Sequence, residues 1–269
     1  MTQNLLLVGC GKMGSALLGG YIRKGRAAST ITAIEPNADM AAILRKDYGI
    51  EVVDSFEKLP SDYRFDIVQL SVKPQMMADV LPAYKEHCTK DTLFISIAAG
   101  KTIAFFEEHL GDEYAIVRVM PNLPALVNKG VTALYGNHNV SDKQKQVTQE
   151  LFSAVGQAFW LEEENQMDSV TAVSGSGPAY VFHFFEALEQ AALKLGLPEE
   201  MSKALAYSTI VGSAEMALDS DKSAGELREQ VTSPKGTTEA GLNVLMAELP
   251  SLIQRTTEAA ANRSKELAD

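Results

Sequence analysis

The chain has 269 residues, 46% of them hydrophobic, and carries a formal net charge of −11 at pH 7. Its length fits two medium-sized domains, and its hydrophobic content excludes a mainly disordered chain. No run approaches the roughly 18 apolar residues of a membrane span, and residues 1–4 lack the basic flank of a signal peptide, so we expect a cytoplasmic protein without a membrane partner. The excess of acidic residues would repel phosphate backbones, so nucleic acid is not an expected partner either.

Cysteine and histidine are too few for a disulfide framework or a metal site. The chain contains only Cys10 and Cys88, and its histidines show no metal-ligand spacing with them. We therefore expect no bound metal, and two free thiols that suit a reducing compartment.

The first 160 residues alternate short apolar runs with amphipathic stretches, which is typical of a parallel sheet covered by helices. Residues 4–9 and 30–34 are predicted strands, and residues 13–24 and 39–46 are predicted helices, which together form a β-α-β-α unit. We therefore expect an α/β fold with a doubly wound domain over residues 1–161. Its further predicted strands cover residues 66–72, 92–97, 115–120, 130–135 and 157–161.

The remaining residues, 162–269, show helical periodicity and almost no β-branched alternation, which predicts an all-helical second domain. Residues 180–195 and 204–218 carry few charges and are apolar on nearly every face, so a small monomer could not expose them. We therefore expect this domain to pair with a second subunit, in a homodimer or a larger homo-oligomer. The predicted helices cover residues 164–173, 178–195, 198–219, 222–230, 237–248 and 250–267.

A glycine-rich loop connects the first predicted strand to the first predicted helix. Its pattern is GxGxxG, in which the first glycine permits a tight turn, the second lets the backbone approach a pyrophosphate, and the third lets helix and strand pack closely. The helix N-terminus then faces the negative charge of the ligand. The strand before and the helix after favour a Rossmann domain that binds NADH or NADPH over a plain turn. The loop consists of Gly9, Cys10, Gly11, Lys12, Met13 and Gly14.

Glu35 ends the second predicted strand, where a doubly wound domain places the adenosine ribose. A carboxylate there accepts hydrogen bonds from a ribose 2′-hydroxyl and repels a 2′-phosphate, which favours NADH mildly over NADPH. An ordinary glutamate in a surface turn is the alternative, so the choice between the two cofactors stays open.

Later segments match one family pattern in order: Ser71 to Pro74, Ile97 to Gly100, Met120 to Pro124, Ser174 to Tyr180 and Ser233 to Thr238. Together they resemble pyrroline-5-carboxylate reductase, over essentially the whole chain. The resemblance implies a Rossmann domain followed by a helical substrate-binding and dimerisation domain. It also implies reduction of 1-pyrroline-5-carboxylate to L-proline by NADPH or NADH, the last step of proline biosynthesis.

The resemblance also assigns residues to the nicotinamide side of the cofactor. These residues follow predicted strands, where a doubly wound sheet leaves its ligand crevice. An exposed lysine before a helix and a rigid proline turn are the structural alternatives for Lys73 and for the segment around Asn122. The implied cofactor residues are Val72, Lys73, Pro74, Ala98, Ala99 and Asn122.

Two loops of the helical domain are candidate substrate-binding elements, because each offers free backbone N–H groups near a helix start. In the resembled family the second loop binds the substrate carboxylate, and the hydroxyl that matches Thr238 approaches the ring nitrogen. We carry this catalytic role to Thr238, where a helix-capping residue is the alternative. Lys235 stands where the family usually has a glycine. The implied substrate residues are Ser174, Gly175, Ser176, Gly177, Ser233, Gly236, Thr237 and Thr238.

Two other side chains are candidate proton donors, and two other functions are alternatives for the chain. Tyr180 and His183 lie on an apolar predicted helix, where we expect both to pack in the core. A dehydrogenase of the 3-hydroxy acid type usually needs a lysine on that helix, and residues 174–190 contain none. A nicotinamide-sensing protein without turnover is the remaining alternative.

Overall fold

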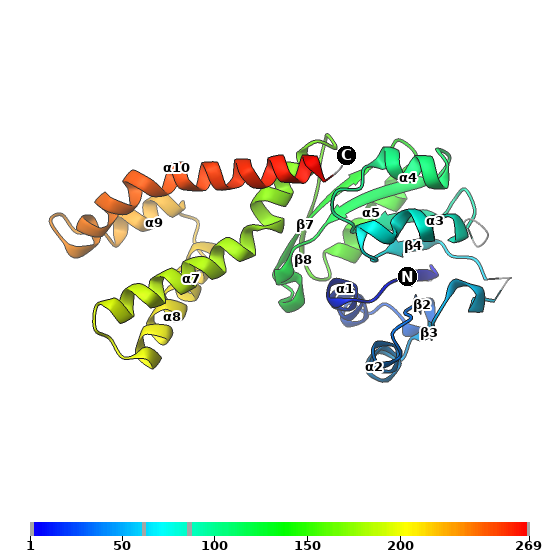
Figure 1. Ribbon diagram of the computed structural model, residues 1–269, viewed down its shortest axis with the longest axis horizontal. Helices are drawn as coiled ribbons and strands as arrows, with labels where there is room; N and C mark the ends of the chain where they lie inside the picture. Colours follow the sequence, from blue (N-terminus) through cyan, green and yellow to red (C-terminus); the bar gives the residue numbers. More distant parts are fainter. Residues whose placement is uncertain (1–2, 61–62, 85–87, 268–269) are drawn as a thin grey trace. The chain divides into compact units, whose positions relative to one another are not determined.

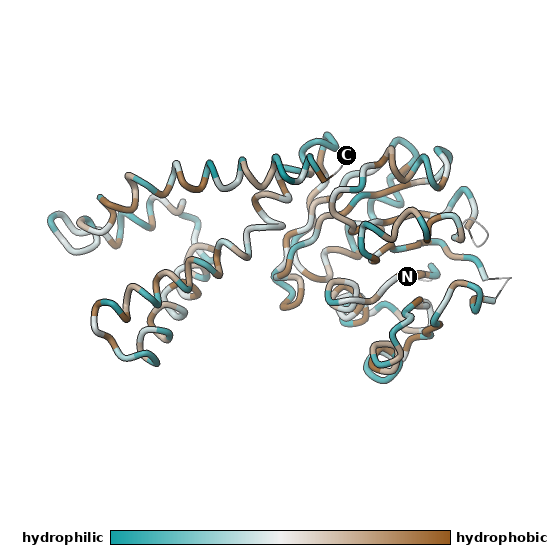
Figure 2. The backbone as a smooth tube through the Cα atoms, in the orientation of Figure 1, coloured by the Kyte–Doolittle hydropathy of each residue, from teal (hydrophilic) through white to brown (hydrophobic). Residues whose placement is uncertain are grey.

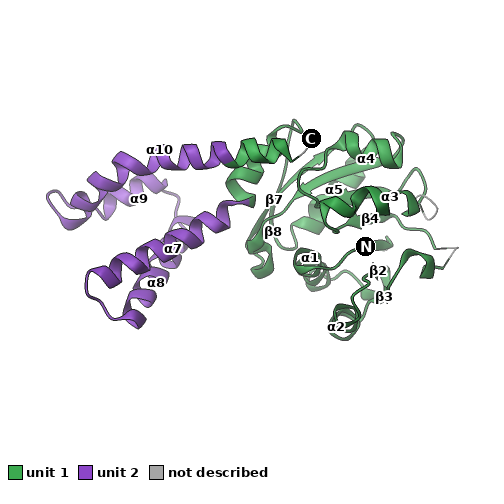
Figure 3. Cartoon of the chain, viewed as in Figure 1, with its two compact units in different colours: residues 1–175, 260–269 green, residues 176–259 purple. Residues whose placement is uncertain are grey.

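The computed structural model describes residues 3–60, 63–84 and 88–267. By its contacts the chain divides into two compact units, one formed by residues 1–175 with 260–269 and the other by residues 176–259 (Figure 3). Every strand of the described residues belongs to the first unit, and the second unit consists of helices and their connections.

The first unit contains an eight-stranded sheet in the order β3-β2-β1-β4-β5-β6-β7-β8 (Figure 1). All neighbouring strands of the described chain are parallel except β6 and β7. The order 3-2-1-4-5-6 is that of a Rossmann domain, so the predicted doubly wound fold is confirmed. The strands are β1 (Leu5–Val8), β2 (Ile31–Ile34), β3 (Glu51–Val53), β4 (Ile67–Leu70), β5 (Leu93–Ser96), β6 (Ala115–Met120), β7 (Gly130–Gly136) and β8 (Gly156–Trp160).

Helices cover both faces of this sheet, because alternate residues of each buried strand enter two different hydrophobic clusters. One cluster joins Leu5 and Leu7 to α1, α2 and α5, and the other joins Leu6 and Val8 to α3 and α4. The α-helices are α1 (Lys12–Arg23), α2 (Ala38–Tyr48), α3 (Met77–Tyr84), α4 (Ile103–Leu110), α5 (Asp142–Phe152) and α6 (Gln166–Val170). Shorter helical turns are η1 (Ala28–Thr30), η2 (Phe56–Lys58), η3 (Pro74–Met76), η5 (Leu123–Val127) and the π-helical η6 (Thr171–Gly175).

The second unit is built from α7 (Gly177–Lys194), α8 (Glu199–Leu218), α9 (Ala224–Gln230) and most of α10 (Thr237–Glu266). Within residues 176–259, only Ser202 and Ala206 are buried. Figure 2 shows hydrophobic positions recurring along α7 and α8. The large exposed side chains on α7, α8 and α10 include Val181, Phe182, Phe184, Met201, Leu205, Tyr207, Val211, Met216, Val244, Leu245 and Met246. This unit therefore lacks a core of its own in the single chain.

Two predictions for the helical region were wrong. Residues 237–248 and 250–267 were expected as separate helices, but α10 runs through Pro250 without a break. Proline removes one intrahelical hydrogen bond, yet its own φ is close to the helical value, so a long helix can continue past it. His183 was expected in the core, but its side chain is 82% exposed and its Nδ1 lies 3.1 Å from Oε2 of Glu186.

Residues 162–175 group with the sheet, although the predicted helical domain begins at residue 162. Met167 and Ala172 are buried there, and the Asn122 side chain binds the backbone of Ser174. Contacts thus place the change of unit at residue 176. A boundary after residue 161 stays a prediction about where the helical sequence begins.

Among the described residues, no helix is long and apolar enough to cross a membrane.

Candidate active site

The glycine loop lies between β1 and α1 and has the three properties that a dinucleotide cradle needs. Gly9 has a φ of +82°, and a methyl group added there would lie 2.9 Å from Cγ1 of Val72. A methyl group on Gly14 would lie 2.8 Å from the carbonyl oxygen of Gly9, so only glycine allows this packing of helix against strand. At Gly11 an added methyl group would meet nothing within 4 Å, which leaves this part of the loop open to a ligand. The geometry fits a bound pyrophosphate.

The start of α1 adds to this fit. Gly11 is its N-cap, with no side-chain cap, and its first turn contains no acidic residue. The backbone N–H groups of a first helical turn lack partners within the helix, and the helix dipole favours an anion beside them.

Glu35 directly follows β2 and is buried, with 8% of its surface exposed. Its Oε2 accepts the backbone N–H of Cys10 at 2.9 Å, and its Oε1 accepts the backbone N–H of Asn37 at 3.0 Å. Burial, and secondarily the charge on Glu35, raises the pKa of the Cys10 thiol to about 12. The carboxylate thus joins the glycine loop to the end of β2, a contact that the sequence did not predict.

The other predicted cofactor residues follow β4, β5 and β6, so parallel pairing brings them to the same edge of the sheet as the glycine loop. Val72 approaches Gly9. Lys73 is exposed and precedes η3, which begins at Pro74. After β5, Ala98 is buried, its N–H donates to Oγ of Ser96 at 3.2 Å, and Ala99 is exposed. Direct contacts of these residues with a cofactor stay predictions.

Asn122 connects two of the predicted groups of residues. Its Nδ2 donates to the carbonyl oxygen of Ser174 at 3.2 Å, and its Oδ1 accepts the N–H of Val131 at 2.9 Å. A methyl group on the neighbouring Gly175 would lie 2.7 Å from Cε of Met120, at the end of β6. The structure therefore brings Ser174 and Gly175 to the cofactor edge of the sheet, and the Asn122 amide holds them there.

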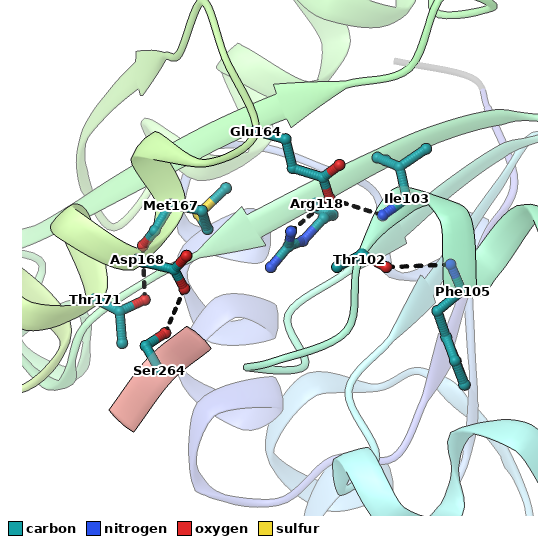
Figure 4. Close-up of polar contacts among 9 residues, drawn as sticks. All are labelled: Thr102, Ile103, Phe105, Arg118, Glu164, Met167, Asp168, Thr171 and Ser264. Atoms are coloured by element: carbon teal, nitrogen blue, oxygen red, sulfur yellow. Dashed lines mark hydrogen bonds and ion pairs between the residues drawn. The ribbon is translucent and has the colours of Figure 1, made fainter. Parts of the chain in front are cut away.

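A polar cluster that the sequence did not predict supports the same edge (Figure 4). The carboxylate of Glu164 forms an ion pair with Nη1 of Arg118 on β6, and it accepts the N–H of Ile103 at 2.7 Å. Asp168 accepts a hydrogen bond of 2.7 Å from Oγ of Ser264, in the last turns of α10. In the sequence, Arg118 within an apolar strand could have indicated this cluster, because a buried charge requires a partner.

The C-terminal end of α10 also contacts the loop after β5. Gly100 has a φ of +74°, and a methyl group there would lie only 2.8 Å from the carbonyl oxygen of Leu267. A residue with a side chain at this position would clash with backbone, so Gly100 allows Leu267 to approach the predicted nicotinamide loop.

The second predicted substrate loop precedes α10. Lys235 has a φ of +58°, in the left-handed region that favours glycine, and its N–H donates to Oε2 of Glu239 at 2.6 Å. The N–H of Gly236 donates to the carbonyl oxygen of Ser233 at 2.9 Å, which closes a tight turn before Thr237 starts the helix. Thr238 lies in the first turn and is half-buried.

The residues of the two predicted substrate loops are divided between the two units. Ser174 and Gly175 are part of the first unit, Ser176 and Gly177 open α7 in the second, and residues 233–238 lie wholly in the second. Among the described residues, no group of three or more Cys, His, Asp or Glu side chains is arranged to hold a metal ion.

Comparison with known proteins matches two parts of the chain to different family models. Residues 4–100 match the family model of NADP oxidoreductases that are coenzyme F420-dependent, and residues 164–267 match the model for pyrroline-5-carboxylate reductase dimerisation. The pyrroline-5-carboxylate reductase of Pseudomonas aeruginosa is 42% identical over 100% of this chain and 98% of its own length. The chain belongs to the pyrroline-5-carboxylate reductase family.

Solved structures of the same family share the whole fold. A pyrroline-5-carboxylate reductase from Coxiella burnetii has a TM-score of 0.93 and 36% identity, with 100% of both chains covered. The Plasmodium falciparum pyrroline carboxylate reductase with NADP bound has a TM-score of 0.84 and 34% identity, covering 99% of this chain and 98% of its own. The predicted family is therefore confirmed.

Proposed function

We propose that this chain is a cytoplasmic enzyme that reduces 1-pyrroline-5-carboxylate to L-proline with NADH or NADPH, the last step of proline biosynthesis. The observation that carries the proposal is its likeness, over the full length, to reductases named for this substrate. The two free cysteines among the described residues suit the reducing environment of the cytoplasm.

The first unit provides the cofactor site. The glycine loop and the first turn of α1 would hold the pyrophosphate, and Glu35 would face the adenosine ribose. Val72, Lys73, Pro74, Ala98, Ala99 and Asn122 would line the nicotinamide side, since they lie along the carboxyl edge of the sheet. When bound, the reduced nicotinamide supplies a hydride for the imine carbon.

The substrate carboxylate would be bound by backbone N–H groups from residues 174–177 and 233–238. Two observations support this role. Lys235 has a left-handed conformation and the chain turns closely at Gly236, which together direct it into the first turn of α10. The N–H groups of that turn have no partners within the helix and favour an anion.

Thr238 would place its hydroxyl beside the ring nitrogen of the imine. A protonated imine accepts a hydride at carbon readily, so the protein needs mainly to align the reactants and to support charge at nitrogen. A single hydroxyl is sufficient for that task, which accounts for a site without an acid–base pair of side chains.

A second subunit would complete the site. The apolar helices of the second unit are exposed in the single chain, and the matched family model describes dimerisation. We infer a homodimer, or a larger homo-oligomer, in which the helices of one subunit serve the cofactor unit of another.

The 3-hydroxy acid dehydrogenase alternative is disfavoured by α7. That helix has one lysine, Lys194, which is in its last turn. A general acid–base lysine nearer the start of the helix is therefore missing.

The test is the initial rate of NADH and NADPH oxidation with 1-pyrroline-5-carboxylate for the wild type, Thr238→Ala, Thr238→Ser and Thr256→Ala. The last variant is a matched control, because the Thr256 hydroxyl donates within α10, to the carbonyl oxygen of Leu252. We expect kcat to fall at least about tenfold in Thr238→Ala, to recover largely in Thr238→Ser, and to change less than about twofold in Thr256→Ala.

The alternatives predict different results in the same assay. Faster turnover of 3-hydroxy acids than of the imine would support the dehydrogenase. Cofactor binding without turnover of any imine or carbonyl acid would support a sensor.

A further inference from the structure

The choice between NADH and NADPH depends on the segment after β2, which faces the adenosine ribose in a Rossmann domain. In this chain the segment is Glu35-Pro36-Asn37-Ala38-Asp39, with two carboxylates and no basic residue. The NADP bound in the Plasmodium relative does not set the cofactor preference of this chain, because the preference depends on the residues that each chain presents to the ribose.

The Glu35 carboxylate is held in place from two sides. The N–H groups of Cys10 and Asn37 each donate to one of its oxygens, while its own backbone N–H donates to the carbonyl oxygen of Val53 at 2.9 Å. With 8% of the residue exposed, the side chain has little freedom to swing away from an incoming group. Each carboxylate oxygen has a second lone pair, so Glu35 can still accept a hydrogen bond from a ribose hydroxyl.

No side chain of the segment after β2 is a cation that would compensate a 2′-phosphate. Nη2 of Arg45 donates to the carbonyl oxygen of Val52 at 2.7 Å. The Asn37 side chain accepts the N–H of Met40 at 2.9 Å and caps α2. Asp39, in the first turn of α2, adds a further negative charge. Lys12 begins α1, outside the segment after β2.

We propose that Glu35 makes this chain prefer NADH to NADPH, because its fixed carboxylate accepts from a free 2′-hydroxyl and repels a 2′-phosphate. The proposal rests on the cofactor site proposed above and does not require the imine to be the substrate. Glu35 is thus assigned two tasks: it positions the glycine loop through Cys10, and it selects the cofactor.

The test measures binding of each reduced cofactor to the full chain, without imine, by titrating nicotinamide fluorescence at one ionic strength. We expect the wild type to bind NADH at least about tenfold more tightly than NADPH. Glu35→Ser removes the charge and leaves room for a phosphate, so the affinity ratio should fall to about one or reverse. The kcat/KM values for the two cofactors should change in the same direction.

Two further variants separate the possible causes. Glu113→Gln removes one charge at the amino end of β6, the opposite edge of the sheet, and should leave the ratio within about twofold of the wild type. Glu35→Gln keeps the size of the side chain but replaces one carboxylate oxygen by an NH₂ group, which cannot accept the N–H of Cys10 or Asn37 that donates at that position. We expect it to weaken NADH binding and to lower the ratio.

Equal affinities in the wild type, or tighter NADPH binding, would overturn the proposal. So would a Glu35→Ser variant that loses affinity for both cofactors by the same factor, because Glu35 would then only position the loop. Absence of imine reduction together with selective NADH binding would contradict the proposed reaction but not this inference.

Discussion

The Cys10 thiol illustrates how a cofactor loop can contain a nucleophile and keep it unreactive. The residue is fully buried, and burial together with the neighbouring Glu35 charge raises its pKa from 9.0 to about 12. Burial likewise raises the pKa of Cys88 to about 12. Because both folded-state values lie above the unfolded value, the stability that these thiols contribute is present below about pH 9 and is lost as the pH rises towards 12.

We expect iodoacetamide to modify neither thiol of the native protein appreciably at pH 8 within the time that modifies the unfolded chain. Raising a thiol pKa from 9.0 to about 12 lowers its thiolate fraction about a thousandfold, and the thiolate is the reactive species. Mass spectrometry of native and urea-unfolded samples measures both sites. Native alkylation of Cys10 at the rate of the unfolded chain would contradict the buried loop.

At the scale of elements, the loop before α10 places a lysine where the backbone favours glycine. The positive φ of Lys235 costs about 1 kcal/mol relative to a residue without a Cβ. A glycine at this position would adopt the same φ without this cost. The N–H of Lys235, which binds Glu239, does not depend on the side chain, so a glycine can keep the same turn.

Lys235→Gly should therefore raise the free energy of unfolding by up to about 1 kcal/mol. The greater conformational entropy of the unfolded glycine variant offsets part of this gain. We expect KM for 1-pyrroline-5-carboxylate to stay within about twofold, because backbone donors are proposed to bind the carboxylate. Urea unfolding and steady-state kinetics measure the two effects. Lys235→Gln is the matched control that removes the charge without freeing the backbone.

If KM instead rose several-fold in both Lys235 variants, the ammonium group would have a direct part in binding the carboxylate. A lower stability of Lys235→Gly would show that the left-handed conformation is not strained in the protein.

At the scale of the whole molecule, two compact units differ in how they are stabilised. The sheet unit has buried clusters on both faces, whereas residues 176–259 bury only Ser202 and Ala206. An exposed apolar surface of this extent is typical of a protein interface. The second unit therefore depends on another copy for the burial that the first unit achieves alone.

Sedimentation velocity should show a dimer or a larger species at assay concentrations, well above the 29.1 kDa of one chain. Phe184→Asp places a charge on the apolar surface of α7 and should weaken association at least about a hundredfold, with a parallel loss of activity. Ile43→Asp is the matched control, since Ile43 is similarly exposed but lies on α2 of the sheet unit. A wild-type monomer would contradict the proposed shared site.

Much of the fold follows from local patterns, and the exceptions have physical causes. Short apolar runs and the glycine loop predicted the order of strands and helices, because buried parallel strands and a dinucleotide turn have distinctive sequences. Strand β3 was missed because it has only three residues, and it is held by pairing with β2. The break predicted at Pro250 was absent because proline lowers helix stability without forbidding a helical φ.

The sequence alone determined the family, the two kinds of unit and the type of cofactor, since these depend on residue types and spacings within single segments. Tertiary structure decided which side chains meet. Glu35 was expected near the ribose, but its bond to Cys10 joins residues 25 positions apart in the sequence, and the Asn122 bond to Ser174 spans 52 residues. Contacts between distant segments leave no local pattern, because each partner alone resembles an ordinary turn or strand residue until folding brings the two together.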